Sequence, residues 1–439
     1  MEMYIVLAIT LFMMVMFIWN KVPFGVTTMT CCLLLAMFGF VDIPKAFGGF
    51  GNKIVVLIAP MLVLSGALGK TSLVMKISSV LNAAKGKRGT VLILVFYAVG
   101  MVMAQFIPTT AAISILVIFL LTLDNAGDIT PKRLLLPLLG VMVGCKFRFP
   151  VGLGATTFAT LNGMYEGVIG DHPEYMLSML DPFKVAIIPM VVLTIYCLFA
   201  WKLMPKEEGI NQDALKKTST EKQLTDAQEM IVYGVFVVVM LLMLLNKYTG
   251  NMLYLAPAAG VLVLIYTKVV SVPEAVKGLT ADMTWMLAGV LIVADAPGST
   301  GAGDMIGNAI LSILGENPSS VTVMFVFSFA TVIMTTFLSN MATQSVLIPI
   351  AASVALAAGW DPRGLVLIIG TCNYYALGFP SGSGEAAVCF AAGGYNPLKV
   401  MKFTFPYMII AAISTAVSAQ LLFPLYKLKI CSERRPAFG

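Results

Sequence analysis

Long apolar runs alternate with short polar connections along most of the chain. A helix needs about 20 apolar residues to cross the hydrocarbon core of a bilayer, so runs that approach this length predict transmembrane helices. The clear runs are residues 2–19, 23–41, 54–69, 183–201, 229–245, 252–267, 283–296 and 403–425. The first run has no basic segment before it and no small-residue cleavage site after it, so it is interpreted as a retained helix. The pattern predicts an all-α integral membrane protein.

Polar residues interrupt the apolar sequence in two further regions, residues 88–170 and 318–398. Gly, Pro, Ser, Thr and Asn occur there at positions expected at membrane depth. Lipid offers no partner for an unpaired N–H or C=O group, so a broken helix persists in a membrane only where protein or a water-filled cavity surrounds it. These two regions are therefore the first place to look for a binding site.

The second half of the chain repeats the layout of the first. With an offset of 226 to 231 residues, residues match in four segments, among them glycine, proline, arginine and asparagine, and Phe149-Pro150 falls on Phe379-Pro380. Apolar segments also align by chance, so the aliphatic matches alone leave both explanations open. Each half contains five clear crossings and one region that either re-enters the membrane as a hairpin or spans it twice. Both alternatives give an odd number per half, which predicts an inverted-topology repeat, as in many secondary transporters.

The expected organisation has three parts. The first inverted repeat covers residues 1–204, with a re-entrant hairpin at about 89–124 that faces the cytoplasm, and a cytoplasmic linker covers 205–228. The second repeat covers 229–439, with a hairpin at about 320–358 that faces the exterior. The basic residues outside the membrane divide as 17 on one side and nine on the other. Because basic loops stay in the cytoplasm, both termini are expected on the outer side of the plasma (inner) membrane.

Composition excludes several classes of protein. Hydrophobic residues make up 59% of the chain and charged residues only 11%, whereas soluble domains carry about 25% charge. The net charge of +6 is spread over the loops and forms no basic stripe, so nucleic acid is not an expected partner. One histidine and seven cysteines without a C-x-x-C motif indicate neither a metal site nor a disulfide framework. Without a catalytic constellation, an enzyme is not expected.

Two polar segments lie at the centres of the hairpin regions, Gln105–Ala112 and Thr336–Thr343. A turn at either segment would expose the first N–H groups of the following half-helix. These donors and the positive end of the helix dipole favour an anion, while hydroxyl and free carbonyl oxygens on the same turn suit Na⁺. Alternatively, Ser-Asn and Pro-Thr-Thr are ordinary N-caps of full-length helices.

A second pair of interruptions follows the hairpins, at Phe149–Gly154 and Phe379–Gly384. Each contains one proline, which removes a hydrogen-bond donor, and two glycines, which weaken a helix. The segments therefore either unwind into two half-helices or bend as kinked packing helices.

Four charged residues fall within the apolar sequence: Lys146, Arg148, Asp295 and Glu385. Ionisable groups in a membrane are costly, so each is a candidate functional residue. Either Lys146 or Arg148 holds a carboxylate substrate, or one of them pairs with Glu385 in a structural salt bridge. Glu385 is also the candidate carrier of a coupling proton, and Asp295 is expected at the membrane interface.

At these residues the chain resembles the divalent anion/sodium symporter family of the ion transporter superfamily, which includes dicarboxylate and citrate carriers. Ser339, Asn340, Ala342 and Thr343 are similar to that family's Ser-Asn-Thr motif at the hairpin tip, with Met341 in place of the first Thr. At the first tip only Thr110 matches. The resemblance covers nearly the whole chain, without the family's usual extra first helix.

The resemblance implies a set of site residues and an assembly. Na⁺ would bind at Ser339, Asn340, Gly152 and Gly382. The anion would bind at Thr109, Thr110, Asn340, Thr343, Ser381 and Ser383, to which the charge argument adds Arg148. The family also implies a homodimer in which a transport domain slides against a scaffold domain, an elevator mechanism.

The sequence therefore predicts a secondary active transporter that imports an organic anion, a di- or tricarboxylate, with Na⁺ as the coupling ion. The alternative is a proton-coupled anion carrier or a cation/proton antiporter of the same superfamily that uses Glu385. An anion channel is a further alternative. The expected partners are the organic anion, the lipid bilayer and a second copy of the chain.

Overall fold

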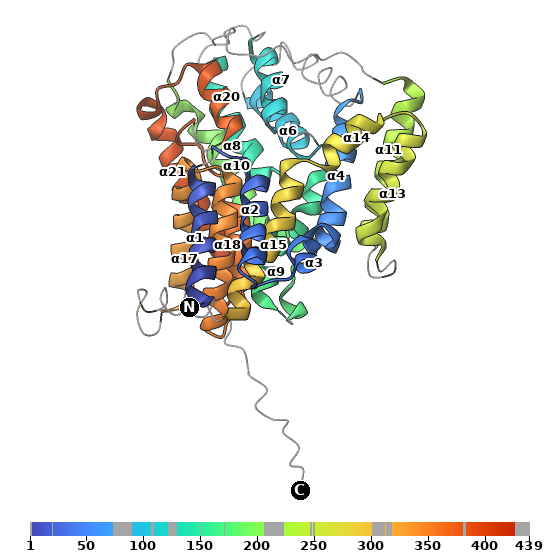
Figure 1. The fold of residues 1–439 in the computed structure, drawn as a ribbon. Helices are drawn as coiled ribbons and strands as arrows, with labels where there is room; N and C mark the ends of the chain where they lie inside the picture. Colours follow the sequence, from blue (N-terminus) through green and yellow to red (C-terminus); the bar gives the residue numbers. More distant parts are fainter. Residues whose placement is uncertain are drawn as a thin grey trace.

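The computed structural model describes residues 2–19, 21–72, 90–106, 109–121, 130–150, 152–170, 172–205, 224–245, 248, 251–300, 312, 318–380 and 383–425. The elements of this part of the chain are helices, as the apolar pattern predicts (Figure 1). Those of the first half are α1 (Glu2–Trp19), α2 (Phe24–Met37), α3 (Ile43–Phe47), η1 (Gly48–Gly51), α4 (Lys53–Gly69), α6 (Thr90–Phe106), α7 (Thr109–Leu121), α8 (Pro131–Cys145), η2 (Gly152–Thr156), α9 (Thr157–Ile169), η3 (Pro173–Tyr175), α10 (Asp181–Ala200) and η4 (Trp201–Leu203).

The second half follows with longer helices on average. Its elements are α11 (Asp226–Leu244), α13 (Met252–Tyr266), α14 (Val272–Leu279), α15 (Asp282–Thr300), α17 (Ser320–Phe337), α18 (Asn340–Ala357), α19 (Arg363–Cys372), α20 (Gly384–Gly393) and α21 (Pro397–Leu422). Polar caps set several helix starts. The Asn52 side chain accepts a hydrogen bond from the N–H of Ile54 at the start of α4, and Thr130 accepts one from Arg133 at the start of α8.

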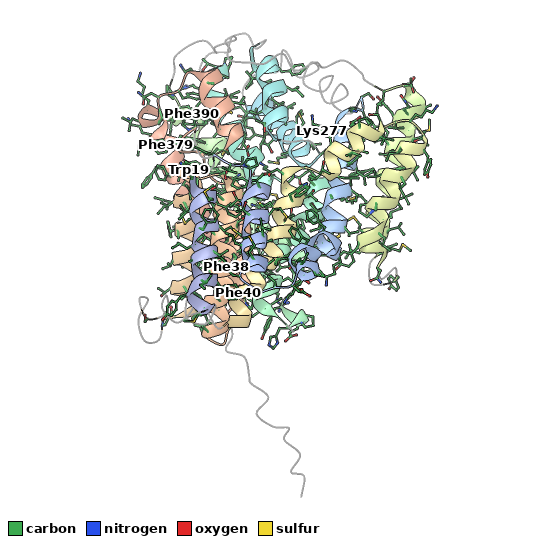
Figure 2. All side chains as sticks on the ribbon, in the orientation of Figure 1. Trp19, Phe38, Phe40, Lys277, Phe379 and Phe390 are labelled. Carbon is green, nitrogen blue, oxygen red and sulfur yellow. The ribbon has the colours of Figure 1, made fainter. Side chains whose placement is uncertain are left out.

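The outside of the molecule is apolar and suits lipid. Among the described residues, six helical segments are long and apolar enough to cross a membrane, or seven if α3–η1 and α4, which meet at 45°, form one span. Trp19 and Phe38 are 56% and 57% exposed at opposite ends of the α1–α2 pair (Figure 2). Exposed apolar surface of this extent is unfavourable in water, so the chain is an integral membrane protein.

The helices form two bundles. Bundle A contains α1–α4, α11 and α13–α15, with α2 packed on α15 and α13 packed on α4. Bundle B contains α6–α10 and α17–α21, with α10 packed on α21 and on α8. The bundles meet mainly where α9 of bundle B packs against α15 and α4 of bundle A.

Each predicted hairpin region contains two helices that pack on each other. Helix α6 ends at Phe106 and packs on α7, and α17 ends at Phe337 and packs on α18. Residues 107 and 108, at the first tip, lie outside the described residues. Figure 1 places α6 and α7 in its upper part and α17 and α18 in its lower part. Helix α17 does not continue into α18, because Leu338 and Ser339 between them have extended backbone. Both helices have 18 residues and meet the length of a full span, so re-entry stays a prediction.

Bundle B has two buried helices at its centre: every residue of α8 is buried, and so is every residue of α19 after Arg363. Both stop at a cysteine, Cys145 and Cys372, and the chain resumes a helical course only at Gly152 and Gly384. Phe147, in the break between α8 and η2, has a positive φ of 53°, which marks a sharp turn in the chain. The first described residues after each helix, up to Arg148 and Gly378, are buried or nearly so, the setting in which non-helical backbone is tolerated in a membrane, whereas Pro380 is exposed.

Candidate functional site

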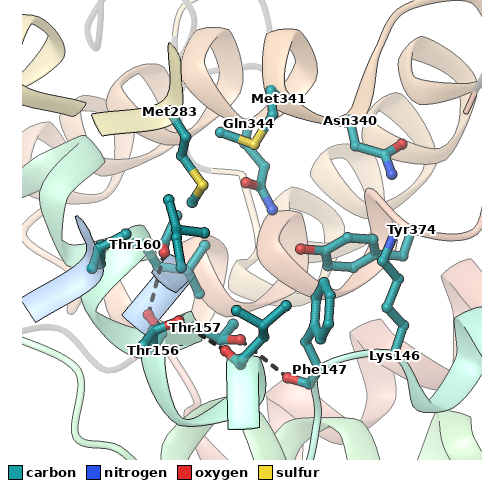
Figure 3. Close-up of a pocket in the computed structure, with 14 residues that line it drawn as sticks. Lys146, Phe147, Thr156, Thr157, Thr160, Met283, Asn340, Met341, Gln344 and Tyr374 are labelled. Carbon is teal, nitrogen blue, oxygen red and sulfur yellow. Dashed lines mark hydrogen bonds between the residues drawn. The ribbon is translucent and has the colours of Figure 1, made fainter. Parts of the chain in front are cut away.

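A cavity of about 280 Å³ lies where the two bundles meet (Figure 3). Bundle A contributes residues of α4 and α15, and bundle B contributes the end of α8, η2, α9, the start of α18 and Tyr374. The volume is just below the range of about 300–1,000 Å³ that small-molecule sites occupy. The lining residues are Ile58, Leu62, Lys146, Phe147, Leu153, Thr156, Thr157, Thr160, Leu161, Met283, Asn340, Met341, Gln344 and Tyr374.

The amide side chains of the cavity come from the first turns of α18. Asn340 and Gln344 are four residues apart and therefore share one face of the helix. Figure 3 shows Gln344 pointing into the cavity. The first N–H groups of α18 have no partner within the helix, and its N-terminus carries the positive end of the dipole. This side of the cavity therefore offers donors and positive potential to an anion.

Three threonines line the opposite side. Thr156 donates to Leu153 O at 2.8 Å, Thr157 to Phe147 O at 3.1 Å, and Thr160 to Thr156 O at 3.2 Å (Figure 3). Because each hydroxyl proton is used in a backbone hydrogen bond, these residues offer lone pairs to a ligand. They suit hydroxyl groups or protonated atoms better than a bare carboxylate.

Lys146 supplies the one ammonium group among the described lining residues. Its Nζ lies 2.6 Å from Glu385 Oε1, and both side chains are almost fully buried. The Nζ also lies 5.0 Å from the ring centroid of Tyr374 and 5.4 Å from that of Phe147. Of the two roles left open by the sequence, the geometry thus pairs Lys146 with Glu385 and also places it at the cavity.

Arg148 points away from this cavity. Its Nη1 donates to Gly370 O at 3.2 Å and its Nη2 to Thr371 O at 2.7 Å, at the C-terminal end of α19. The side chain is 1% exposed. Arg148 does not line the cavity, and its role with the substrate stays a prediction.

Oxygen atoms converge at the second hairpin. Thr335 Oγ1 lies 2.9 Å from Asn340 Oδ1 and 2.7 Å from Asn373 O. The hydroxyl has one proton and donates to only one of the two oxygens at a time. The buried side-chain atoms of Asn373 and the Thr343 hydroxyl have no hydrogen-bond partner in the described structure. The cluster contains hydroxyl, amide and backbone oxygens, and it has fewer protons to donate than oxygens that can accept them. Such oxygens suit Na⁺ as ligands.

The first hairpin tip lies elsewhere. Thr109 is 1% exposed and its hydroxyl has no hydrogen-bond partner in the described structure, and α7 packs on α20. Thr110 lies close to Gly384 at the start of α20. Neither threonine lines the cavity, so the structure does not bring the two predicted tips together around it.

The remaining predicted residues have varied positions. Ser339 caps α18 by accepting a hydrogen bond from Ala342 N at 3.2 Å, and Ser383 caps α20 through Ala386 N at 3.2 Å. Gly152 begins η2. Ser381, Gly382 and the side chain of Asp295 lie outside the described residues.

Several residues have no counterpart in the sequence prediction: Thr156, Thr157, Thr160, Gln344 and Tyr374 at the cavity, and Thr335 and Asn373 in the oxygen cluster. A signal was present for Gln344, which follows Asn340 by one helical turn. Asn373 and Tyr374 carried no such signal, because only the place where α19 ends brings them to the site.

Comparisons with known proteins agree with this geometry. The sequence profile of the citrate transporter family, CitMHS, matches residues 14–370. The sodium-dependent dicarboxylate transporter SdcS of Staphylococcus saprophyticus is 21% identical over 448 aligned positions, which cover 95% of this chain and 86% of that protein. The resemblance inferred from the hairpin motifs is thereby confirmed.

Solved structures share the fold. The crystal structure of the Alcanivorax borkumensis YdaH transporter superposes with a TM-score of 0.61 at 12% identity, over 93% of this chain and 98% of that one. The structure of Neisseria gonorrhoeae MtrF, from a class of antimetabolite efflux pumps, superposes with a TM-score of 0.54 at 13% identity, over 89% and 84%. At these identities the likeness concerns the fold alone.

Proposed function

Because the chain belongs to the citrate transporter family, we propose that it is a secondary active importer of a di- or tricarboxylate, coupled to Na⁺ and working by alternating access. The observation that carries this proposal is the cavity between the bundles, which combines the Lys146 ammonium, two amides and the N-terminus of α18. A relative over nearly the full length is named a sodium-dependent dicarboxylate transporter, which supports both the substrate class and the ion.

In the proposed binding step, one carboxylate lies at the start of α18. The NH₂ groups of Asn340 and Gln344 and the free N–H groups of the helix donate to it. Lys146 attracts a second carboxylate, and the threonines accept from a hydroxyl group. The predicted substrate residue Asn340 keeps its role, whereas Lys146 takes the place proposed for Arg148. Thr343, with its unpartnered hydroxyl on the next turn of α18, stays part of the proposed site.

Na⁺ is cargo in this proposal and binds at the oxygens of Thr335, Asn340 and Asn373. Since Asn340 presents its Oδ1 to Thr335 and its NH₂ group remains for the anion, this residue links the two ligands. A carboxylate alone in the low-dielectric interior would cost several kcal/mol, so cation and anion stabilise each other. Of the predicted Na⁺ residues, Asn340 stays central and Ser339 orders the tip as a cap. The roles of Gly152 and Gly382 stay predictions.

We further propose the inverted repeat and its elevator motion. The packing supports the repeat. Helices α13 and α4 of the two halves correspond to α2 and α15, and both pairs pack together. Helix α10 also packs on its own counterpart, α21. In this scheme bundle A is the scaffold and bundle B carries the re-entrant hairpins. The repeat boundaries 1–204 and 229–439, the outward orientation of both termini and the homodimer belong to the same proposal.

A specific observation favours one alternative, proton coupling. Lys146 and Glu385 form a buried pair at the cavity, so a substrate carboxylate competes with Glu385 for the ammonium. Protonation of Glu385 would free Lys146 for the substrate. In this alternative the carboxyl group of Glu385 carries the coupling proton.

Uptake into proteoliposomes tests the proposal and its alternative. Purified protein is reconstituted, and uptake of labelled citrate and succinate is driven either by a Na⁺ gradient at equal pH or by a pH gradient without Na⁺. We expect at least about 10-fold faster uptake with the Na⁺ gradient. Uptake driven by pH alone, and lost in Glu385→Gln, would establish the alternative instead. Single-channel currents in planar bilayers would indicate a channel.

A further inference from the structure

Arg148 carries a positive charge in the interior of bundle B, and its surroundings are not those of an ion pair. In the part of the chain that the structure describes, no carboxylate forms an ion pair with it. Its guanidinium instead bonds to the carbonyls of Gly370 and Thr371. The rings of Tyr374 and Tyr375 lie 5.1 and 6.0 Å from its Cζ. The charge is thus compensated by backbone carbonyls and aromatic faces.

The two carbonyls belong to the end of a helix dipole. They are among the last of α19, which ends at Cys372, and such carbonyls lack partners within the helix. The C-terminus of a helix carries about half a negative charge. Helix α8 ends at Cys145, three residues before Arg148, whose own N–H bonds to Cys145 O at 3.2 Å. The guanidinium thus faces the partial negative charge at the end of α19, and the backbone N–H of the same residue faces the end of α8.

In transporters built from broken helices, the C-terminal ends of half-helices are where coupling cations bind. Here the guanidinium of Arg148, a cation that belongs to the chain itself, already occupies the end of α19. The guanidinium donates charge-assisted hydrogen bonds to two carbonyl oxygens. A bound Na⁺ would instead be coordinated by these oxygens directly. This position is therefore closed to an exchangeable ion.

Gln105 closes a comparable position in the first repeat. With the offset of 231 residues that aligns Phe106 with Phe337, it corresponds to Thr336, the neighbour of Thr335. Its Nε2 donates to Cys145 O at 2.5 Å, and its Oε1 accepts from Phe149 N at 3.3 Å. The amide thus satisfies both sides of the break after α8. The Thr335 hydroxyl, by contrast, lies within hydrogen-bond distance of two oxygens but has one proton to donate.

We propose that Arg148 is a built-in counter-cation that stands in for one exchangeable Na⁺, and that transport is coupled to a single Na⁺ at the Thr335–Asn340–Asn373 oxygens. This rests on the proposed Na⁺-coupled import and deepens it by setting the number of ions. Removal of the guanidinium opens two carbonyls at the end of α19 to a free cation.

The test compares Arg148→Ala with Arg133→Ala. Arg133 is a matched control because it is also buried, donates to the carbonyls of Met204 and Lys202, and lies 5.6 Å from the Trp201 ring, but stands at the start of α8, away from both breaks. Thermal unfolding of each protein in lipid nanodiscs is followed in choline chloride, with Na⁺ or guanidinium replacing choline at constant ionic strength.

We expect Arg148→Ala to lose several degrees of melting temperature and to regain at least half of the loss with Na⁺ or guanidinium at about 50 mM, because bound cations stabilise the folded state. Arg133→Ala keeps the native Na⁺ site, so it should gain from Na⁺ only what the wild type gains, and it should gain nothing from guanidinium. Arg148→Lys, which keeps the charge, should show the wild-type dependence on Na⁺. An equal response of Arg148→Ala and Arg133→Ala, or none in either, would overturn the proposal.

A second measurement does not depend on any variant. The Na⁺ dependence of citrate or succinate uptake by the wild-type protein should have a Hill coefficient of about one, and a coefficient near two would contradict a single site. Uptake that ignores Na⁺ altogether would refute the proposed Na⁺ coupling. Restoration of Arg148→Ala by guanidinium would in that case still support Arg148 as a counter-cation.

Discussion

Thr335 has one hydroxyl proton and two oxygen neighbours, so its replacement separates a cation site from ordinary packing. Thr335→Val keeps the shape of the side chain and removes the ligand oxygen. If the hydroxyl binds Na⁺, the apparent dissociation constant for Na⁺ in citrate uptake should rise at least about 10-fold, since one charge-assisted contact contributes about 1.5–3 kcal/mol. The measurement is uptake against Na⁺ concentration in proteoliposomes.

The control for this substitution lies one turn earlier on α17. Thr331 is also fully buried, and its hydroxyl donates to Phe327 O at 2.6 Å, away from the oxygen cluster. Thr331→Val should therefore leave the Na⁺ dependence unchanged. If both variants shift it equally, the effect comes from helix packing and the Na⁺ assignment fails.

Single charged residues also show where sequence reasoning stops. Lys146 and Arg148 stand two positions apart within one break, and local sequence treats them alike. The structure directs Lys146 to Glu385, 239 residues away, and Arg148 to carbonyls 222 and 223 residues away. Such partners follow from how the two breaks face each other, which no local pattern encodes.

Helix contacts depend on small residues where backbones come close. Gly49 of η1 is buried against α15, and a Cβ atom there would lie 2.0 Å from the backbone oxygen of Ala288. Since backbone cannot move aside as a flexible side chain does, Gly49→Ala should cost about 1–3 kcal/mol. The expected result is a fall of several degrees in the melting temperature of the protein in detergent.

The neighbouring glycine provides the comparison. A Cβ atom at Gly48 meets nothing within 4 Å, and its φ of −63° suits alanine. Gly48→Ala should leave the melting temperature within about one degree of wild type. Equal losses in the two variants would mean that η1 needs glycine for chain flexibility and not for the approach to α15.

At the scale of elements, the sequence located the interruptions well. Proline and glycine act on the residues beside them, so helix ends near Pro150 and Pro380 follow from local chemistry. The capping role of Ser339 was among the alternatives for the same reason. Local chemistry did not reveal that α8 and α19 are buried on every side, because such burial depends on which helices surround them.

The contact between α9 and α15 joins the two bundles, so the proposed motion requires it to slide. A Cβ atom at Gly163 of α9 would lie 3.6 Å from Leu287 Cδ2 of α15. In a background without the seven native cysteines, Gly163→Cys with Leu287→Cys should allow Hg²⁺ to bridge the two thiols. Uptake should then fall at least about 10-fold and recover when excess thiol removes the metal.

A pair within bundle A serves as the control for cross-linking. A Cβ atom at Gly260 of α13 would lie 3.0 Å from Val239 Cγ2 of α11. Cross-linking Val239→Cys with Gly260→Cys joins helices of one bundle, so uptake should persist. Continued uptake after the α9–α15 bridge has formed would rule out sliding at this contact.

The sequence by itself determined that the chain crosses a membrane repeatedly, where its helices break, and which family it resembles, because hydrophobicity, proline and glycine act over a few neighbouring residues. Only the tertiary structure decided the partners at those breaks. It pairs Lys146 with Glu385, places the Arg148 guanidinium at the end of α19, and places Asn373 beside Thr335. The physical reason is that a buried charge or unpaired oxygen is stabilised by whatever group packing places within about 3 Å, wherever that group lies in the chain.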